Sequence, residues 1–251
     1  MTELAYLPDL PSAYVRTFRA RVVALPPGGV VLDRTYFYPG GGGQPPDRGR
    51  LRSGDVEWEV VDTARTGPTV VHRLRRRGAA APPLALGSEV EGVIDWTRRY
   101  RHMRLHTGQH FLSARIFTRT GLRTAKAVLS GVGASLDLEG ELPAAVLADL
   151  EADLAGALDH PHPITIRHVP RAEWDATSFA PRSGLVPLAP QVDPVRVVEI
   201  QTEDACPCGG THVRSTREIG RLVLASPVAQ VGGGCRLTFT LEDPELPTPP
   251  E

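Results

Sequence analysis

The sequence is short of cysteine and of long apolar runs, and each shortage excludes a class of protein. Three cysteines in 251 residues are too few for a disulfide framework. We therefore expect a reduced compartment, and a metal or redox role is the first interpretation of these cysteines. No apolar run approaches the roughly 18 residues that span a bilayer, and the N-terminus lacks the basic head and apolar centre of an export signal. We therefore expect a cytoplasmic protein with no membrane contact, and the sequence indicates no protein partner.

The remaining composition, with 41% hydrophobic and 23% charged residues, is that of a globular protein with one large domain or two small ones. Residues 1–95 are expected to form a small antiparallel β-barrel. Strand-like alternation there covers 14–25, 29–38, 56–61, 69–74 and 89–96, separated by glycine and proline turns. Residues 96–251 are expected to form an α+β domain with an antiparallel sheet packed by helices. Its helices are expected from Trp96 onward and over 143–158, and its strands over 164–169, 195–201, 220–225 and 236–241.

Acidic residues are absent between Trp96 and Leu136, although the whole chain has a net charge of only −1. The same stretch carries the basic residues Arg98, Arg99, Arg101, Arg104, Arg115, Arg119, Arg123 and Lys126. A solvated helix face normally mixes both signs, because pairs of opposite charge one turn apart stabilise it. A long stretch of one sign instead favours a polyanionic partner.

Two short motifs have the spacing of metal ligands. His106 and His110 are four residues apart, so both imidazoles lie on one face of the expected helix and can reach one ion. Cys208 and His212 enclose two glycines, which let the backbone wrap closely around an ion. Together these four side chains form a nitrogen and sulfur ligand set suited to Zn²⁺, with Cys206 as the alternative thiolate.

A glycine-rich loop follows the expected strand 29–38. Gly40, Gly41, Gly42 and Gly43 precede Gln44 and present consecutive backbone donors without side-chain obstruction. No Gly-Lys-Ser/Thr follows and no helix begins there, which excludes a P-loop and a dinucleotide-binding turn. A flexible linker is one interpretation, but bracketing aromatic and proline residues favour the wall of a pocket.

Three motifs in this order carry a resemblance to a known family. They are Thr35-Tyr-Phe-Tyr-Pro39 with Gly-Gly-Gly-Gln-Pro-x-Asp-x-Gly, then Ile94-Asp-Trp96 leading through Arg99-Tyr100 and Met103-Arg104 into His106-Thr-Gly-Gln-His110, then Cys208-Gly-Gly-Thr-His212. From Tyr14 to Leu241 the chain resembles the alanyl-tRNA editing proteins (AlaX, medium-length type), which are free-standing relatives of the editing domain of alanyl-tRNA synthetase.

The resemblance implies hydrolysis of the ester that joins serine, and in second place glycine, to tRNA for alanine. It implies Zn²⁺ as cofactor, held by His106, His110, Cys208 and His212, and a mischarged tRNA as partner. The residues expected in the catalytic centre are His106, Thr107, Gln109 and His110. Those expected to contact the substrate are Gly40, Gly41, Gly42, Gly43, Gln44, Thr211, Arg98, Arg99 and Arg104.

Several roles stay open at this stage. Thr107, Gln109 and Thr211 are candidates for a hydrogen bond to the serine hydroxyl, but a bond to a ligand histidine or a local cap is an equal alternative for each. Four protein ligands are typical of structural zinc, whereas hydrolytic zinc keeps one position for water. The rival functions are therefore a zinc-stabilised RNA-binding module without catalysis and a hydrolase for small esters.

Overall fold

The computed structural model describes residues 1–76, 83–177, 188–225, 229–231 and 233–243. The chain divides into two compact units, Met1–Tyr100 and Arg101–Glu251. Both the barrel of the first unit and the sheets and helices of the second are present, which confirms the predicted mixed α+β class. Within the described ranges, no helix combines the length and apolarity needed to cross a bilayer.

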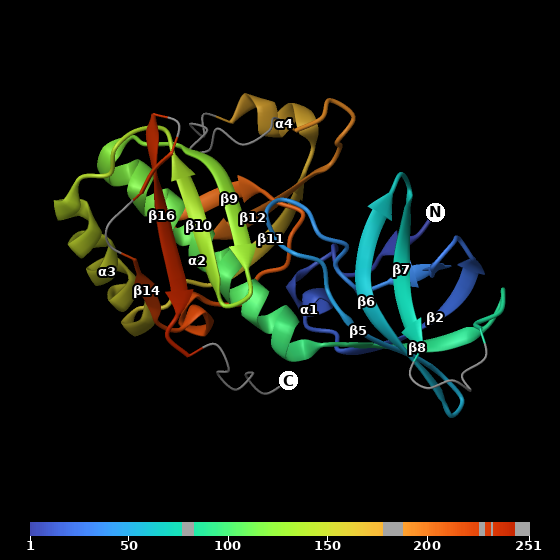
Figure 1. Cartoon of the computed structure of the whole chain (residues 1–251). Helices are drawn as coiled ribbons and strands as arrows, with labels where there is room; N and C mark the ends of the chain where they lie inside the picture. Colours follow the sequence, from blue (N-terminus) through green and yellow to red (C-terminus); the bar gives the residue numbers. More distant parts are fainter. Residues whose placement is uncertain (77–82, 178–187, 226–228, 232, 244–251) are drawn as a thin grey trace. The chain divides into compact units, whose positions relative to one another are not determined.

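The first unit is a closed barrel of six antiparallel strands, as predicted (Figure 1). Around the barrel these are β2 (Thr17–Ala24), β3 (Gly29–Leu32), β7 (Thr69–Arg76), β6 (Val56–Thr66), β5 (Gly49–Ser53) and β8 (Glu89–Ile94). Outside it are the short parallel pair β1 (Glu3–Leu4) and β4 (Arg34–Thr35) and the helix α1 (Leu10–Ala13). Alternate side chains fill the interior, with Phe18, Leu51 and Trp58 among the buried residues.

Two details of this unit differ from the prediction. The expected strand 29–38 is split at Asp33, whose carboxylate Oδ1 accepts the backbone N–H groups of Arg21 and Arg34 at 2.8 Å each. This side-chain competition for backbone donors ends β3 and starts β4 in a new direction. Strand β5 was not expected, because Leu51 is its only fully buried residue and the apolar signal is correspondingly weak.

The second unit contains two antiparallel sheets (Figure 1). One has the order β14-β16-β10-β9, with β15 also paired to β16, and the other the order β11-β12-β13. The strands are β9 (Thr124–Ser130), β10 (Gly133–Leu138), β11 (Ile164–Val169), β12 (Val195–Ile200), β13 (Asp204–Pro207), β14 (Leu222–Leu224), β15 (Ala229–Val231) and β16 (Gly234–Leu241). The helices are α2 (Trp96–Thr120), which begins in the first unit, α3 (Ala144–Asp159), α4 (Arg171–Ala176) and the 3₁₀ turn η1 (Thr216–Ile219).

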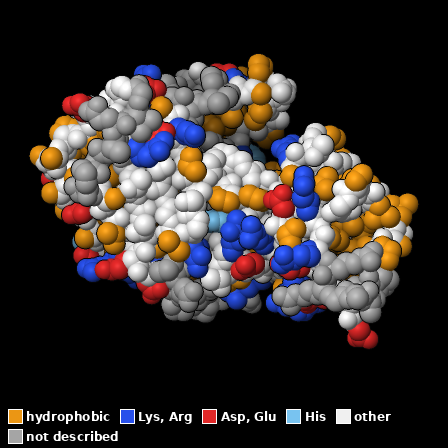
Figure 2. Space-filling view, viewed as in Figure 1, with side chains coloured by type: hydrophobic (Ala, Val, Ile, Leu, Met, Phe, Trp, Pro, Cys, Tyr) orange, Lys and Arg blue, Asp and Glu red, His pale blue; other side chains and the backbone are white. Residues whose placement is uncertain are grey.

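Helix α2 lies behind the sheet formed by β9, β10 and β16, while the other face of that sheet carries mostly uncharged side chains (Figures 1 and 2). The helix begins after Asp95, whose carboxylate accepts the backbone N–H of Arg98 at 3.1 Å. Every residue from His102 to Ala114 is buried. The middle of the helix is therefore enclosed on all sides despite its polar sequence, and its polar side chains must find partners inside the protein.

Candidate metal centre

Three imidazoles and one thiol converge in the second unit. His106 and His110 lie one turn apart on α2, and Cys208 and His212 lie in the loop that follows β13. The four donor atoms all lie within 4.8 Å of one another. Cys208 Sγ is 3.5 Å from His106 Nε2 and 3.3 Å from His212 Nε2. A tetrahedral zinc ion with bonds of about 2.0–2.3 Å separates its donors by roughly 3.3–3.8 Å, so the spacing suits such an ion.

The loop from Cys208 to His212 is fixed by hydrogen bonds within the loop and to strand β12. Gly210 donates its N–H to Cys208 Sγ at 3.3 Å. The Cys208 N–H donates to the Arg196 carbonyl at 3.1 Å, and the Arg196 guanidinium donates to the Cys208 carbonyl in return. Cys206 lies outside the four-residue cluster, and its thiol faces the Pro207 carbonyl at 3.6 Å. The sulfur that reaches the cluster is thus that of Cys208.

Two histidines of the cluster are held at their outer ring nitrogens. His110 Nδ1 lies 3.1 Å from the carboxylate Oδ2 of Asp204, which is 5% exposed. His212 Nδ1 lies 3.1 Å from Thr107 Oγ1, which also accepts the Val213 N–H at 3.2 Å. With Nδ1 engaged in this way, Nε2 of each ring is left for the centre of the cluster.

The pKa shifts of Cys208 and His212 favour the protonation states of metal ligands, whereas that of His110 favours the protonated ring. Burial raises the pKa of Cys208, but the charges of His106 and His212 and hydrogen bonds to His106 and His110 outweigh it, so this pKa lies well below its ordinary value. Burial, with His106 nearby, lowers the pKa of His212 to about 3. The pKa of His110 is raised, because the hydrogen bonds to Asp204 and Cys208 outweigh burial. A thiolate and a neutral imidazole are the forms that bind zinc.

The polar residues beside the ligands are buried and occupied. The hydroxyl of Thr107 engages His212, which matches the alternative in which this residue orients a ligand. Gln109 is 4% exposed and donates from Nε2 to Ser113 Oγ at 3.0 Å, and Thr124 Oγ1 lies 2.9 Å from the same Ser113 oxygen. Thr211 is fully buried.

Four residues near the cluster were missed by the sequence reasoning. Asp204 on β13 contacts His110, and Arg196 on β12 contacts Cys208. Ser113, on the next turn of α2, contacts Gln109 and Thr124 of β9. Only Ser113 carries a sequence signal, since it lies seven residues after His106 on the same helical face. The other three are brought to these contacts by the packing of strands β9, β12 and β13 with α2 and the loop from Cys208 to His212.

The glycine-rich loop, in the first unit, is a tight hairpin. Gly41 and Gln44 exchange backbone hydrogen bonds of 3.1 and 2.9 Å, and Gly42 and Gly43 between them have φ of 54° and 84°. Two successive positive φ values define a turn that only glycine-like residues adopt without strain. The Tyr38 hydroxyl donates to the Gly41 carbonyl at 2.7 Å. The side chain of Gln44, expected to face a substrate, is 2% exposed and turned into the protein.

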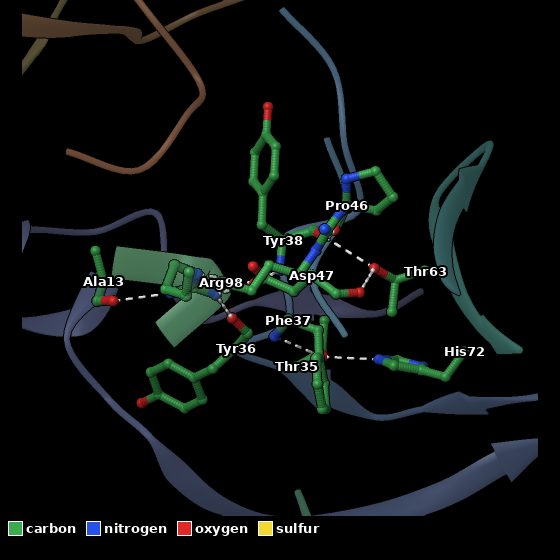
Figure 3. A network of polar contacts seen from close by, with 11 residues as sticks. Ala13, Thr35, Tyr36, Phe37, Tyr38, Pro46, Asp47, Thr63, His72 and Arg98 are labelled. Atoms are coloured by element: carbon green, nitrogen blue, oxygen red, sulfur yellow. Dashed lines mark hydrogen bonds and ion pairs between the residues drawn. The ribbon is translucent and has the colours of Figure 1, made fainter. Parts of the chain in front are cut away.

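The base of this hairpin is fastened to the first turn of α2 (Figure 3). Arg99 is fully buried and donates from Nε to Asp47 Oδ2 at 2.8 Å and from Nη1 to the Ala13 carbonyl at 2.8 Å. Arg98 donates from Nε to the Pro46 carbonyl at 3.1 Å. Asp47 Oδ2 also accepts the Tyr38 N–H at 2.7 Å. The structure therefore assigns both arginines to holding the loop.

The predicted basic surface along α2 needs correction. Arg104 is fully buried and donates to the Ile219 carbonyl at 3.0 Å and to the Asp243 carbonyl at 2.7 Å. Arg115 pairs with Glu203 at 2.7 Å, and Arg119 pairs with Asp153 at 2.8 Å. Arg99 and Arg104, both predicted to contact phosphates, are inaccessible, because the fold buries their guanidinium groups against carbonyl and carboxylate oxygens.

Comparison with known proteins agrees with this architecture. Residues 13–98 match the family described as "tRNA synthetases class II (A)", and residues 195–233 match "Threonyl and Alanyl tRNA synthetase second additional domain". The alanine–tRNA ligase of Pyrobaculum neutrophilum is 36% identical over 262 residues, which cover 95% of this chain and 28% of the ligase. The chain thus spans little more than a quarter of that ligase.

Free-standing relatives match over their full length. The alanyl-tRNA editing protein AlaX-M of Methanosarcina acetivorans is 34% identical over 248 residues, covering 97% of this chain and 100% of that protein. The AlaX-M protein of Saccharolobus solfataricus is 33% identical over 245 residues, covering 96% and 100%. These full-length matches confirm the resemblance read from the three motifs, and the chain belongs to the family of alanyl-tRNA editing proteins.

Proposed function

We propose that this protein hydrolyses the ester of mischarged Ser-tRNA for alanine, with Gly-tRNA for alanine as a second candidate substrate. The observation that carries the proposal is the convergence of His106, His110, Cys208 and His212 within 4.8 Å in a chain of this family. In the reaction, a water oxygen bonds to the ester carbonyl carbon and the bond from that carbon to the terminal ribose oxygen breaks. The products are the free amino acid and uncharged tRNA.

The four ligands fit Zn²⁺ in donor type and in spacing, and the pKa shifts of Cys208 and His212 favour the thiolate and the neutral imidazole. When bound there, zinc supplies a positive charge that orients or polarises an oxygen or amine of the aminoacyl end. Asp204 and Thr107 hold the rings of His110 and His212 from outside. The carboxylate of Asp204 and the thiolate of Cys208 would together balance the two charges of the ion.

Gln109 is our candidate for contact with the aminoacyl group. Its amide nitrogen is engaged by Ser113, so its oxygen is the group left to accept a hydrogen bond from a substrate hydroxyl or ammonium. A site that accepts a hydrogen bond from the serine hydroxyl rejects alanine, because the buried acceptor would then lose its partner. Since an aminoacyl ester is already activated, positioning and polarisation suffice for hydrolysis.

The second candidate function is a zinc-stabilised tRNA-binding module without catalysis. The observation in its favour is the number of candidate protein ligands, since four such ligands are typical of structural zinc. Two of them, His212 and His110, are also hydrogen-bonded at Nδ1 by Thr107 and Asp204.

Incubation with Ser-tRNA for alanine separates the two candidates. We expect the wild-type protein to release serine, and His106→Ala to lose both the metal and this activity. Cys206→Ala is the matched control, because its sulfur lies outside the cluster, and it should keep both. Binding of the charged tRNA without any loss of ester would contradict hydrolysis and support the module.

A further inference from the structure

Two arginines of the barrel unit flank the end of strand β8. Arg16 precedes β2 and Arg48 precedes β5, and these two strands pair with opposite edges of β8. The Ile94 N–H donates to the Arg16 carbonyl at 2.9 Å, and the Asp95 N–H donates to the Arg48 carbonyl at 2.8 Å. Two strand spacings of about 4.8 Å place the two main chains about 10 Å apart at this end of the barrel.

Arg16 is held by an aromatic stack. Its Cζ lies 4.8 Å from the centroid of the Trp96 ring, and that ring is itself stacked on Tyr100 at 5.7 Å with an interplanar angle of 20°. Stacking uses the face of a guanidinium group and leaves the N–H donors at its edge available. Among the described residues, no carboxylate lies within ion-pair distance of Arg16. The fork of donors is thus oriented in advance for an oxyanion.

Arg48 is exposed and lines a cavity of about 520 Å³ together with Arg50, Asp95 and Trp96. The carboxylates of this cavity are already engaged. Asp95 caps helix α2, and Glu59, also in the lining, binds Arg75 through two nitrogens at 2.8 and 3.1 Å. Arg48 has no ion-pair partner among the described residues. Arg50, also in the lining, pairs with Glu57 at 3.4 Å, so Arg48 is the arginine of this lining whose guanidinium group is not in an ion pair with any described residue.

We propose that Arg16, Arg48 and the Trp96 platform form a contact surface for the phosphate backbone of RNA. This inference rests on the proposed function, since it names the surface through which the substrate tRNA is held. Trp96 connects the two arginines, because Arg16 Cζ lies over its ring and the same residue lines the cavity of Arg48. Two separate guanidinium groups beside one residue suit successive phosphates of one strand better than a single phosphate ion. The Trp96 ring already contacts Tyr100 and Arg16, so we expect the surface to bind backbone phosphates rather than to stack on a base.

The test measures binding of uncharged tRNA for alanine against salt concentration. For the double variant Arg16→Ala, Arg48→Ala, we expect weaker binding and a slope of log K against log salt that is smaller by about 1 for each arginine. Arg167→Ala is the matched control, because this arginine is 54% exposed in its side chain, pairs with Glu199 and does not line this cavity. It should bind like the wild type, with an unchanged slope.

Further measurements keep failure of this surface distinct from failure of the enzyme. Wild-type affinity and slope in the double variant would overturn the surface whether or not the protein deacylates Ser-tRNA. A reduced slope in a protein that releases no serine would support the surface and contradict only the proposed function. If the double variant unfolds, the exposed single variant Arg48→Glu gives the same comparison. Displacement of tRNA by inorganic phosphate beyond that by chloride at equal ionic strength would indicate a single-phosphate site and overturn the proposal.

Discussion

Two buried polar clusters, one in each unit, differ in what their polar atoms face. In the barrel unit, donors face acceptors, and the guanidinium of Arg99 is bound by Asp47 and by main-chain carbonyls. In the second unit, the lone pairs of three imidazoles and one thiol face one another within 4.8 Å. The first cluster pairs its own charges, those of Arg99 and Asp47, and serves the architecture. The second is arranged so that a shared cation would complete it, which is the difference between a structural network and a candidate ligand site.

The largest effect is expected from breaking the barrel cluster. Arg99→Ala leaves the carboxylate of Asp47 buried and without its counter-charge, which costs about 3–5 kcal/mol in the free energy of unfolding. Urea denaturation measures this cost. Arg75→Ala, at an exposed ion pair, is the control and should cost no more than about 1 kcal/mol. Equal losses in the two variants would mean that Arg99 does not fasten the loop.

A smaller effect is expected at the edge of the second cluster. Asp204→Asn replaces the charged acceptor at His110 Nδ1 by a neutral amide and should weaken zinc binding about 10- to 100-fold. Competition with a chelator measures this affinity. Glu203→Gln is the matched control, because the neighbouring carboxylate pairs with Arg115 and not with a ligand. Equal zinc affinity in Asp204→Asn and in Glu203→Gln would refute a role for Asp204 in holding the metal.

The smallest effect concerns pH and a buried histidine of the barrel. His72 accepts at Nε2 from the Thr35 hydroxyl at 2.8 Å (Figure 3), and burial lowers its pKa to about 4. Between pH 6.5 and 4 the unfolded chain binds a proton at His72 that the folded chain does not, so stability falls as the pH drops through this window. We expect a loss of about 1–2 kcal/mol between pH 7 and 5 that His72→Gln abolishes.

Urea denaturation at pH 7, 6 and 5, followed by tryptophan fluorescence, gives the pH slope for each protein. Because the metal ligands also titrate, the informative quantity is the difference between the two slopes. Identical slopes for wild type and His72→Gln would show that His72 does not carry this dependence.

The barrel, helix α3 and the two ligand motifs could be predicted from the sequence, because each depends on local patterns. The alternation in β2 places every second side chain on one face of the strand in any fold. The four-residue spacing likewise places His106 and His110 on one face of a helix in any fold. The basic surface could not be predicted in the same way. The carboxylates that neutralise Arg115 and Arg119 come from residues 34 to 88 positions away, and periodicity carries no information about such partners.

Local chemistry in the sequence determined which residues can bind a metal, where the glycine turn lies and which family the motifs resemble. The tertiary structure decided which sulfur joins the ligands, which carboxylate supports them and which arginines remain exposed. The reason is physical: donor types and dihedral freedom are properties of single residues, whereas burial and charge compensation arise only when distant strands and helices pack together.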